Sequence, residues 1–432
     1  MRQSLSALIL LAVLLTGCSN SYQISSAAEH KEQVTLNVVT SYGQDDGSHD
    51  LYEAAVSNFQ KETGVDIRDH SDVSSEKWKN KVLTDFITGS EPDVLFYFVD
   101  ADAEPIVQAE KVVSIEEIRE LYPDYASNMK GSMMPVAYDG RHYAVPSTGF
   151  WETMFVNKTV LDQCGIEIPG PDYTWSQFLE DCQTIKECGF IPIACSLFET
   201  PHYLFEFTVM NNGTVHDHYQ CPRLTEDGQL KDEPVSRKWI QALNDIKLFY
   251  DEGFFPENTL TASDTETVSL FAEGKAAFLV DGSWKVGYFT ENYPDHLNNY
   301  LVSYFPGKGG RAATDAIGGI SMGYYITRKA WNDLDKRQAA VDFVSYMTSD
   351  DVLNTFVTTE VTALQNGTYQ ETRNPIEKSA AAALDCLSAV TGAVQDTITS
   401  EAKKELFSNI SKVASGQMSA ADAVKSALKF NE

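Results

Sequence analysis

Basic residues are scarce in this sequence. Its 432 residues include 33 Lys and Arg against 62 Asp and Glu, which gives a formal net charge of −29. A protein that binds a nucleic-acid backbone needs a surface rich in Lys and Arg, so the composition argues against a nucleic-acid partner. The acidity is equally consistent with solubility outside a cell and with attraction of a cationic ligand.

An apolar run long enough to cross a membrane is also lacking. The run LSALILLAVLL, from Leu5 to Leu15, falls short of the about 20 residues that a spanning helix needs. It has the length of a signal-peptide core, and it ends in Leu-Thr-Gly-Cys, which resembles a bacterial lipobox. We therefore expect a lipoprotein signal peptide at 1–18, diacylation of Cys18 and a flexible tether at 19–33. An ordinary signal peptide is the alternative.

The cysteine pattern excludes a zinc site of known spacing. The only cluster, His216, His218 and Cys221, is followed by no second ligand pair, so we interpret it as a solvated loop and expect no metal. An even number of cysteines follows Cys18, which permits disulfides outside the cell, although a large domain does not need them. Both states remain open for Cys164, Cys182, Cys188, Cys195, Cys221 and Cys386.

Catalytic and phosphate-binding motifs are incomplete. Gly319–Gly323 reads G-x-S-x-G, but a nucleophile elbow needs a strand before it and a helix after it, and Tyr324–Thr327 is strand-like. Gly274 and Lys275 lack the remaining residues of a phosphate loop. We therefore expect neither catalysis nor a cofactor. A surface hydrolase that uses Ser321 or a pair of carboxylates is kept as an alternative.

The first part of the chain alternates strand and helix patterns. Apolar runs at Val34–Ser41 and Val94–Val99 enclose two amphipathic segments that end at Gly64 and Gly89, which predicts a mainly parallel α/β sheet. Ligands of such sheets bind at the carboxyl ends of the strands. Asp100 and Asp102 directly follow the second run, which makes them candidate ligand contacts as well as ordinary turn residues.

Aromatic residues follow further predicted strands and turns. Phe150, Trp151 and Glu152 come after a Pro and a Gly, and side-chain alternation lets only one of the two rings face a cleft. Tyr203 follows the predicted strand Ile191–Ala194. All four residues are candidates for a binding surface.

The stretch Phe271–Trp284 combines a helix end at Gly274, a buried strand and a turn. It leaves Asp281 and Trp284 at the carboxyl end of the strand. Taken alone, the pattern is equally compatible with a core Trp and with a Trp in a binding site.

Several stretches in matching order resemble family 1 extracellular solute-binding proteins, the sugar-binding lipoproteins of ABC importers, with maltose-binding protein a distant relative. They are the lipobox at Cys18, WKNKVLTDFITGSEPDVLFY, VPSTGFWETMFVNKTVLDQCGI, TWSQF, FAEGKAAFLVDGSW, GGISMGYYITRKAW, AAVDFVSYMTS and SAADAVKSAL. The resemblance implies a type II periplasmic-binding-protein fold. It has two α/β lobes, each a mainly parallel sheet flanked by helices, joined by hinge strands. We expect an N-terminal lobe at 34–145 and 322–349, and a C-terminal lobe at 146–318 and 350–432.

The resemblance also implies roles for individual residues. Trp284 becomes a sugar-stacking platform with Asp281 nearby, and Phe150 or Trp151 joins it from the crossing strand, with Glu152 beside them. The remaining implied contacts are hydroxyl acceptors at Asp100 and Asp102, a side wall at Tyr203 and a close backbone approach at Gly319. The segment 389–399 departs from the pattern, because it has no Trp or Tyr where some relatives place a stacking ring.

The sequence thus leads to a specific hypothesis. We expect a membrane-anchored, monomeric, non-catalytic receptor that binds a sugar or oligosaccharide between two lobes and delivers it to the permease subunits of an ABC importer. Binding of a polyamine or another small cation by the same fold is the first alternative, since aromatic rings and carboxylates suit both ligands.

Overall fold

The computed structural model describes residues 33–44, 46–135 and 137–431. Residues 34–432 form one compact unit. The predicted signal peptide, Cys18 and most of the predicted tether lie outside the described residues. Within the described ranges, no helix combines the length and the apolar character that crossing a bilayer requires.

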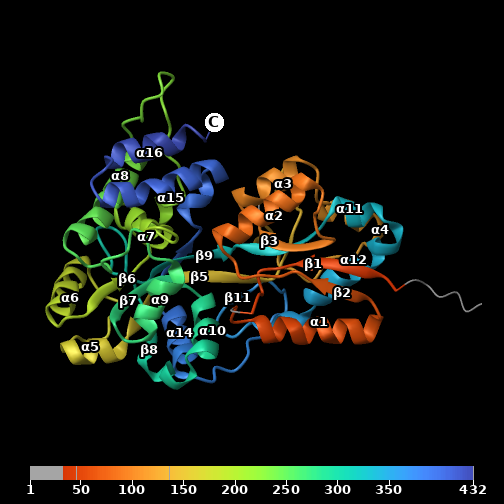
Figure 1. The fold of residues 1–432 in the computed structure, drawn as a ribbon, viewed down its shortest axis with the longest axis horizontal. Helices are drawn as coiled ribbons and strands as arrows, with labels where there is room; N and C mark the ends of the chain where they lie inside the picture. The colour runs from red at the N-terminus through yellow and green to blue at the C-terminus, as the bar shows by residue number, and fades with distance from the viewer. Residues whose placement is uncertain (1–32, 45, 136, 432) are drawn as a thin grey trace, which may run out of the picture. The chain divides into compact units, whose positions relative to one another are not determined.

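The first sheet organises what we call the N-lobe (Figure 1). Its strand order is β2-β1-β3-β10-β4. Apolar residues of α1 and α12 pack on one face of this sheet, and those of α2 and α3 pack on the other. The bounds are β1 Thr35–Val39, β2 Asp66–Asp69, β3 Val94–Phe98, β4 Val145–Pro146, β10 Met322–Ile326, α1 His49–Thr63, α2 Glu76–Thr88, α3 Glu104–Gln108, α4 Ile115–Leu121, α11 Arg328–Asn332, α12 Leu334–Met347 and α13 Asp350–Phe356.

The second sheet organises the C-lobe. Its strand order is β12-β9-β5-β7-β6, and β8 and β11 pair with β5. The strands are β5 Thr148–Asn157, β6 Ile191–Ala194, β7 Ala276–Gly282, β8 Tyr300–Ser303, β9 Asp315–Ile320, β11 Val361–Thr362 and β12 Ala389–Thr391. The helices are α5 Lys158–Cys164, α6 Trp175–Glu187, α7 His202–Asn211, α8 Pro234–Asp251, α9 Asp264–Ala272, α10 Trp284–Asn292, α14 Pro375–Asp385, α15 Ser400–Ala414 and α16 Ala420–Leu428.

Strand direction differs in part from the prediction. Two α/β sheets are confirmed, but both are mixed rather than mainly parallel. In the N-lobe, β10 runs antiparallel to β3 and β4. In the C-lobe, β5 runs antiparallel to β7, β8, β9 and β11. The cause is the crossing between sheets: β4 is followed almost at once by β5, and β9 by β10, so these strands arrive against the direction of the β-α-β strands.

The C-terminal boundary of the N-lobe is also corrected. Val352, Leu353 and Phe356 of α13, together with Ala363 and Leu364, belong to the N-lobe core rather than to the C-lobe. The ring of Phe356 packs 5.6 Å from that of Tyr42. Ile376 already lies in the C-lobe core, so the chain, which touches the C-lobe sheet briefly at β11, returns to that lobe between 364 and 376 and not at 350. The helix ends predicted at Gly64, Gly89 and Gly274 are confirmed by left-handed φ angles of 74°, 76° and 73°.

Candidate ligand-binding site

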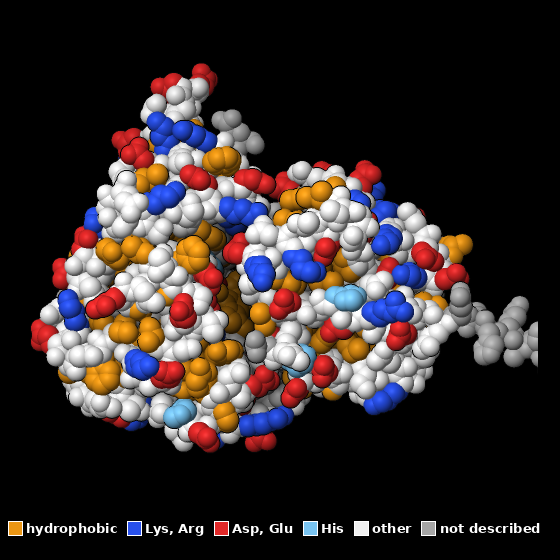
Figure 2. Space-filling model, in the orientation of Figure 1, with side chains coloured by type: hydrophobic (Ala, Val, Ile, Leu, Met, Phe, Trp, Pro, Cys, Tyr) orange, Lys and Arg blue, Asp and Glu red, His pale blue; other side chains and the backbone are white. Residues whose placement is uncertain are grey.

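Three aromatic rings from three different elements meet at the end of the C-lobe sheet. Trp284, the first residue of α10, is 37% exposed. Its ring centroid lies 6.2 Å from that of Phe150 on β5 and 5.9 Å from that of Tyr203 on α7. Figure 2 shows a hollow between the C-lobe and the N-lobe whose visible wall carries hydrophobic side chains. We call Phe150, Tyr203 and Trp284 the aromatic cluster.

The indole of Trp284 lies over Gly282. A Cβ atom at position 282 would come within 2.2 Å of Cη2 of Trp284. Any residue larger than glycine would therefore push the indole away from the strand end. The predicted position of Trp284 after the carboxyl end of a strand is confirmed, because β7 ends at Gly282 and α10 begins at Trp284.

Alternation along β5 separates the two adjacent aromatics. Trp151 is 1% exposed, and its Nε1–H donates a hydrogen bond to the carbonyl oxygen of Thr359 at 3.0 Å. Its assignment to the site is therefore corrected: Trp151 is a core residue. Phe150 points to the opposite face of the strand and joins the aromatic cluster. Gly319 is its register partner on β9, where an added Cβ would still stay 3.8 Å from Cε1 of Phe150.

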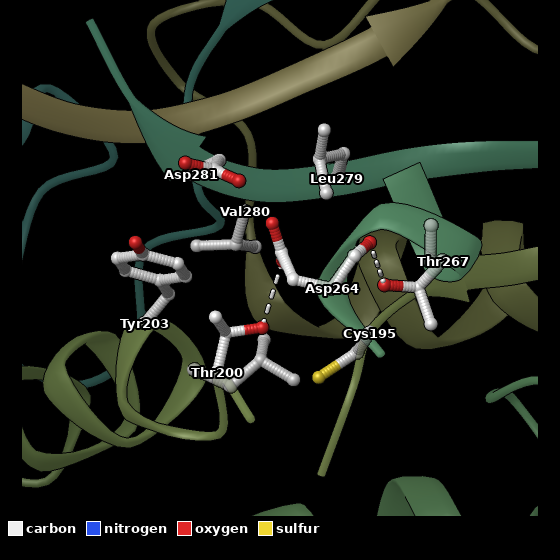
Figure 3. A pocket seen from close by; sticks show the side chains of 10 residues that line it. Cys195, Thr200, Tyr203, Asp264, Thr267, Leu279, Val280 and Asp281 are labelled. Atoms are coloured by element: carbon white, nitrogen blue, oxygen red, sulfur yellow. Dashed lines mark hydrogen bonds between the residues drawn. The ribbon is translucent and has the colours of Figure 1, made fainter. Parts of the chain in front are cut away.

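Asp281 lies beneath the cluster rather than on its surface. Its Oδ1 accepts the backbone N–H of Gly282 at 2.8 Å, and Nζ of Lys285 lies 3.5 Å from its Oδ2. The same Lys285 donates to Asp264 at 3.1 Å. Burial raises the pKa of Asp281 to about 7. Figure 3 shows Asp281 on β7 and Tyr203 on α7 at one end of the small cavity that Asp264 also lines.

Glu152 is also buried, with 3% of its surface exposed. Its Oε2 has no hydrogen-bond partner among the described residues. Burial, together with the carboxylates of Glu206 and Asp281, raises the pKa of Glu152 well above its ordinary value. Burial therefore disfavours the ionised form of this carboxyl group, and Glu152 lies inside the sheet rather than on a binding surface beside the rings.

The two acids after β3 are bound by the other lobe. Asp102 is buried and accepts hydrogen bonds from Ser400 of α15 at 2.7 Å and from Lys79 at 3.1 Å. Lys403 of α15 donates to Asp100 at 2.7 Å and to Asp396 at 3.1 Å. Their position after a strand is confirmed, and in the described conformation protein groups bond these carboxylates.

The two lysines beside Asp102 compensate for the burial of its carboxylate. Burial acts to raise the pKa of Asp102, but Lys403 and Lys79 outweigh it and hold that pKa at about 2. The acid therefore stays ionised and offers its negative charge to lysines. Sequence reasoning missed the cluster because Lys403 stands about three hundred residues further along the chain.

A second contact joins the two lobes through glycines. Gly47 lies in the loop before α1, and a Cβ added there would come within 2.5 Å of the carbonyl carbon of Gly287 in α10. The two backbones therefore touch directly. The described conformation thus brings the lobes together both here and at Asp102.

The His216 to Cys221 segment is only in part the solvated loop that we predicted, because His216, Tyr219 and Gln220 are exposed but His218 is buried. The side chain of His218 is fully buried, and its Nε2 lies 3.2 Å from Oε2 of Glu206. Glu206 in turn accepts the backbone N–H groups of Val394 and Gln395. Among the described residues no group of three or more His, Cys, Asp or Glu could hold a metal ion. The six described cysteines are free thiols.

Ser321 does not stand on a nucleophile elbow. It separates β9 from β10, so a strand follows it where the hydrolase motif requires a helix. The G-x-S-x-G segment is therefore part of a crossing between the lobes and not a nucleophile elbow.

Comparison with known proteins defines the class. Residues 46–353 match the family model of the bacterial extracellular solute-binding proteins. That match covers more than half of the chain, and the protein therefore belongs to this family. The expected family resemblance is confirmed.

Individual relatives are more distant. The chain is 24% identical over 353 residues to the multiple sugar-binding protein of Streptococcus mutans, covering 79% of this chain and 76% of that one. It is 24% identical over 212 residues to the arabinooligosaccharide-binding protein of Halalkalibacterium halodurans, covering 49% and 44%.

Solved structures share the architecture. A chitin oligosaccharide binding protein superposes with a TM-score of 0.75 at 19% identity, over 92% of this chain and 98% of that one. A solute-binding protein in complex with raffinose superposes with a TM-score of 0.70 at 19% identity, over 91% and 98%. The expected two-lobe fold is thereby confirmed.

Proposed function

We propose that this protein binds a neutral sugar or oligosaccharide in the hollow between its lobes and delivers it to an ABC importer. The observation that carries the proposal is the exposed ring of Trp284, grouped with Phe150 and Tyr203 at the end of the C-lobe sheet. A pyranose has an apolar C–H face that stacks on such rings and a rim of hydroxyls that accepts and donates hydrogen bonds. The names of the two curated relatives support a sugar as the ligand.

The charge balance favours a neutral ligand over a polyamine. A polyamine needs carboxylates that are ionised and free. Asp100 and Asp102 are engaged by Lys403 and Lys79, and burial raises the pKa of Glu152 well above its ordinary value, which disfavours its ionised form. The cluster of rings is therefore better suited to an uncharged ring than to an ammonium group.

Transport follows from lobe closure. Closing the lobes on a ligand shifts an existing equilibrium between open and closed forms, and the permease subunits recognise the closed form. The lipobox sequence supports anchoring of a monomer to the outer face of a bacterial membrane through diacylated Cys18. Release of the protein from membranes on Cys18→Ala tests the anchor.

Titration calorimetry tests the ligand class. The panel contains raffinose, chitin oligosaccharides, arabino-oligosaccharides and their component monosaccharides, with spermidine as the cation. We expect saccharide binding that Trp284→Ala weakens by about 1–3 kcal/mol. Tyr369→Ala is the control, since Tyr369 is exposed and lies outside the aromatic cluster.

Two results would overturn the proposal. One is binding of spermidine without binding of any glycan. The other is turnover of an ester or a glycoside that is lost in Ser321→Ala, which would make the protein a hydrolase. Unchanged affinity and a lowered melting temperature in Trp284→Ala would instead mean that Trp284 only supports the fold.

A further inference from the structure

A single ammonium group bridges carboxylates from both lobes. Nζ of Lys403 in α15 lies 2.7 Å from Oδ2 of Asp100 and 3.1 Å from Oδ1 of Asp396. Asp100 directly precedes η1 (Ala101–Ala103) of the N-lobe, and Asp396 lies in η5 (Val394–Thr397) of the C-lobe. Because both carboxylates bond the same nitrogen atom, an acid of one lobe lies beside an acid of the other at the contact between the lobes.

Acids are in excess at this contact. Asp102 accepts hydrogen bonds from Lys79 of the N-lobe at 3.1 Å and from Ser400 of the C-lobe at 2.7 Å. Among the described residues, the ion pairs of the contact join two ammonium groups to four carboxylates, namely Lys79 and Lys403 to Glu76, Asp100, Asp102 and Asp396. The contact therefore carries more negative than positive charge.

The surroundings of Asp396 favour its protonated form. In the described part of the chain, the charged and titratable groups that face it are Lys403, Asp100, Glu206 of α7 with its partner His218, Glu152 of β5 and Tyr219. Burial, Asp100 and Glu206 raise the pKa of Asp396 well above its ordinary value, although the charge of Lys403 opposes them. Asp102 behaves differently, because its two lysines keep it ionised. Asp396 is thus the acid of this contact that gains a proton.

Opening of the lobes separates these groups unevenly. Lys403 and Asp396 both belong to the C-lobe, so their ion pair can persist in an open form. Asp100 belongs to the N-lobe and meets Lys403 only when the lobes close. Closure therefore adds the ion pair of Lys403 with Asp100, but it also brings the negative charge of Asp100 against that of Asp396. A proton on Asp396 removes this repulsion and lets its hydroxyl donate to Asp100.

We propose that closure of the lobes is coupled to uptake of a proton by Asp396 and Asp100, so that the protein binds its sugar more tightly as the medium becomes acidic. The inference rests on the proposed function, since it assumes that a sugar closes the lobes. The closed form holds the proton more tightly than the open form, in which Asp396 faces Lys403 without Asp100. The gain is fully present below the ordinary carboxyl pKa of about 4 and is lost as pH rises through the higher pKa of the closed form.

Calorimetry on the full chain counts the proton. Raffinose, chitotriose and arabinotriose are titrated at pH 5, 6, 7 and 8, each in two buffers that differ in their enthalpy of ionisation. For the saccharide that binds, we expect the wild type to take up as much as one proton. Its Kd should rise with pH by at most about tenfold per pH unit.

Two variants test the two carboxylates separately. Asp396→Asn supplies an amide that can donate to Asp100 without titrating, so its Kd should be about the same at all four pH values, with no proton uptake. Asp100→Asn removes the like charge from the other lobe and should abolish the uptake as well. Asp251→Asn is the matched control, because Asp251 is an exposed acid of the C-lobe that pairs with Lys247 of its own helix. It should keep the uptake of the wild type.

Small-angle scattering of the protein alone tests closure without a sugar. The radius of gyration of the wild type should fall from pH 8 to pH 5, and that of Asp396→Asn should stay constant. Melting temperatures of all variants show whether each is folded. Asp281→Asn should keep the uptake, because Asp281 bonds Gly282 and Lys285 within the C-lobe alone.

Three results would overturn the inference: sugar binding by the wild type without proton uptake, an uptake that persists in Asp396→Asn, or an uptake that only Asp281→Asn removes. Failure of the wild type to bind any saccharide is a different result, which removes the proposed function. The scattering series then still decides whether closure depends on pH through Asp396.

Discussion

Nζ of Lys403 lies 2.7 Å from Oδ2 of Asp100, and this ion pair joins α15 of the C-lobe to the N-lobe loop after β3. The side chain of Lys403 is only 5% exposed, and it also bonds Asp396. Buried charges of this kind cost much free energy when one partner is lost, because the other charge remains uncompensated. One buried ammonium group therefore carries much of the charge pairing in this contact between the lobes.

Lys403→Met should weaken both the fold and ligand binding. The variant leaves buried carboxylates without their cation, so we expect a loss of about 3–5 kcal/mol in the free energy of unfolding. Because the pair forms only when the lobes meet, the open form should gain population and the saccharide affinity should fall. Denaturant unfolding, small-angle scattering and calorimetry measure the three effects. Lys404→Met, an exposed neighbour on the same helix, is the matched control, and equal behaviour of the two variants would contradict the prediction.

Gly282→Ala should displace the indole of Trp284 while keeping the backbone of β7. The φ angle at 282 is outside the left-handed region, so alanine is compatible with the backbone, but its Cβ collides with the six-membered ring of Trp284. We expect a saccharide affinity about tenfold lower and a change in the tryptophan fluorescence. Gly131→Ala adds a methyl group where no atom lies within 4 Å, and it should leave both unchanged. If Gly282→Ala bound saccharide with the affinity of the wild type, Gly282 would not be needed to position the indole of Trp284.

Asp281 should make stability fall as pH rises through neutrality. Its pKa is raised from 3.8 to about 7 in the folded protein, so the folded state holds the proton more tightly than the unfolded chain. The contribution is fully present below about pH 4 and is lost as pH rises towards 7, with a slope of at most about 1.4 kcal/mol per pH unit. Asp281→Asn removes this slope. Melting temperatures of both proteins are measured at pH 5, 6, 7 and 8. The melting temperature of the wild type should fall more steeply between pH 5 and pH 7 than that of Asp281→Asn, and parallel curves would refute the assignment.

Much of the architecture could be predicted because it is encoded locally. Apolar runs and left-handed glycines predicted β1, β3 and the ends of α1 and α2, and each is confirmed. Strand direction could not be predicted. The crossings from β4 to β5 and from β9 to β10 look like ordinary strands in sequence, and only their partners show that they run against the others.

The candidate site divides in the same way. Local sequence patterns predicted that Trp284 follows a strand and that one of two adjacent rings faces outward. The folded structure was needed to show that Trp151 is the buried ring and that Lys403 pairs with Asp100. The physical reason is range. Strand and helix signals arise between residues a few positions apart, whereas burial and ion pairing depend on which distant segments the folded chain packs together.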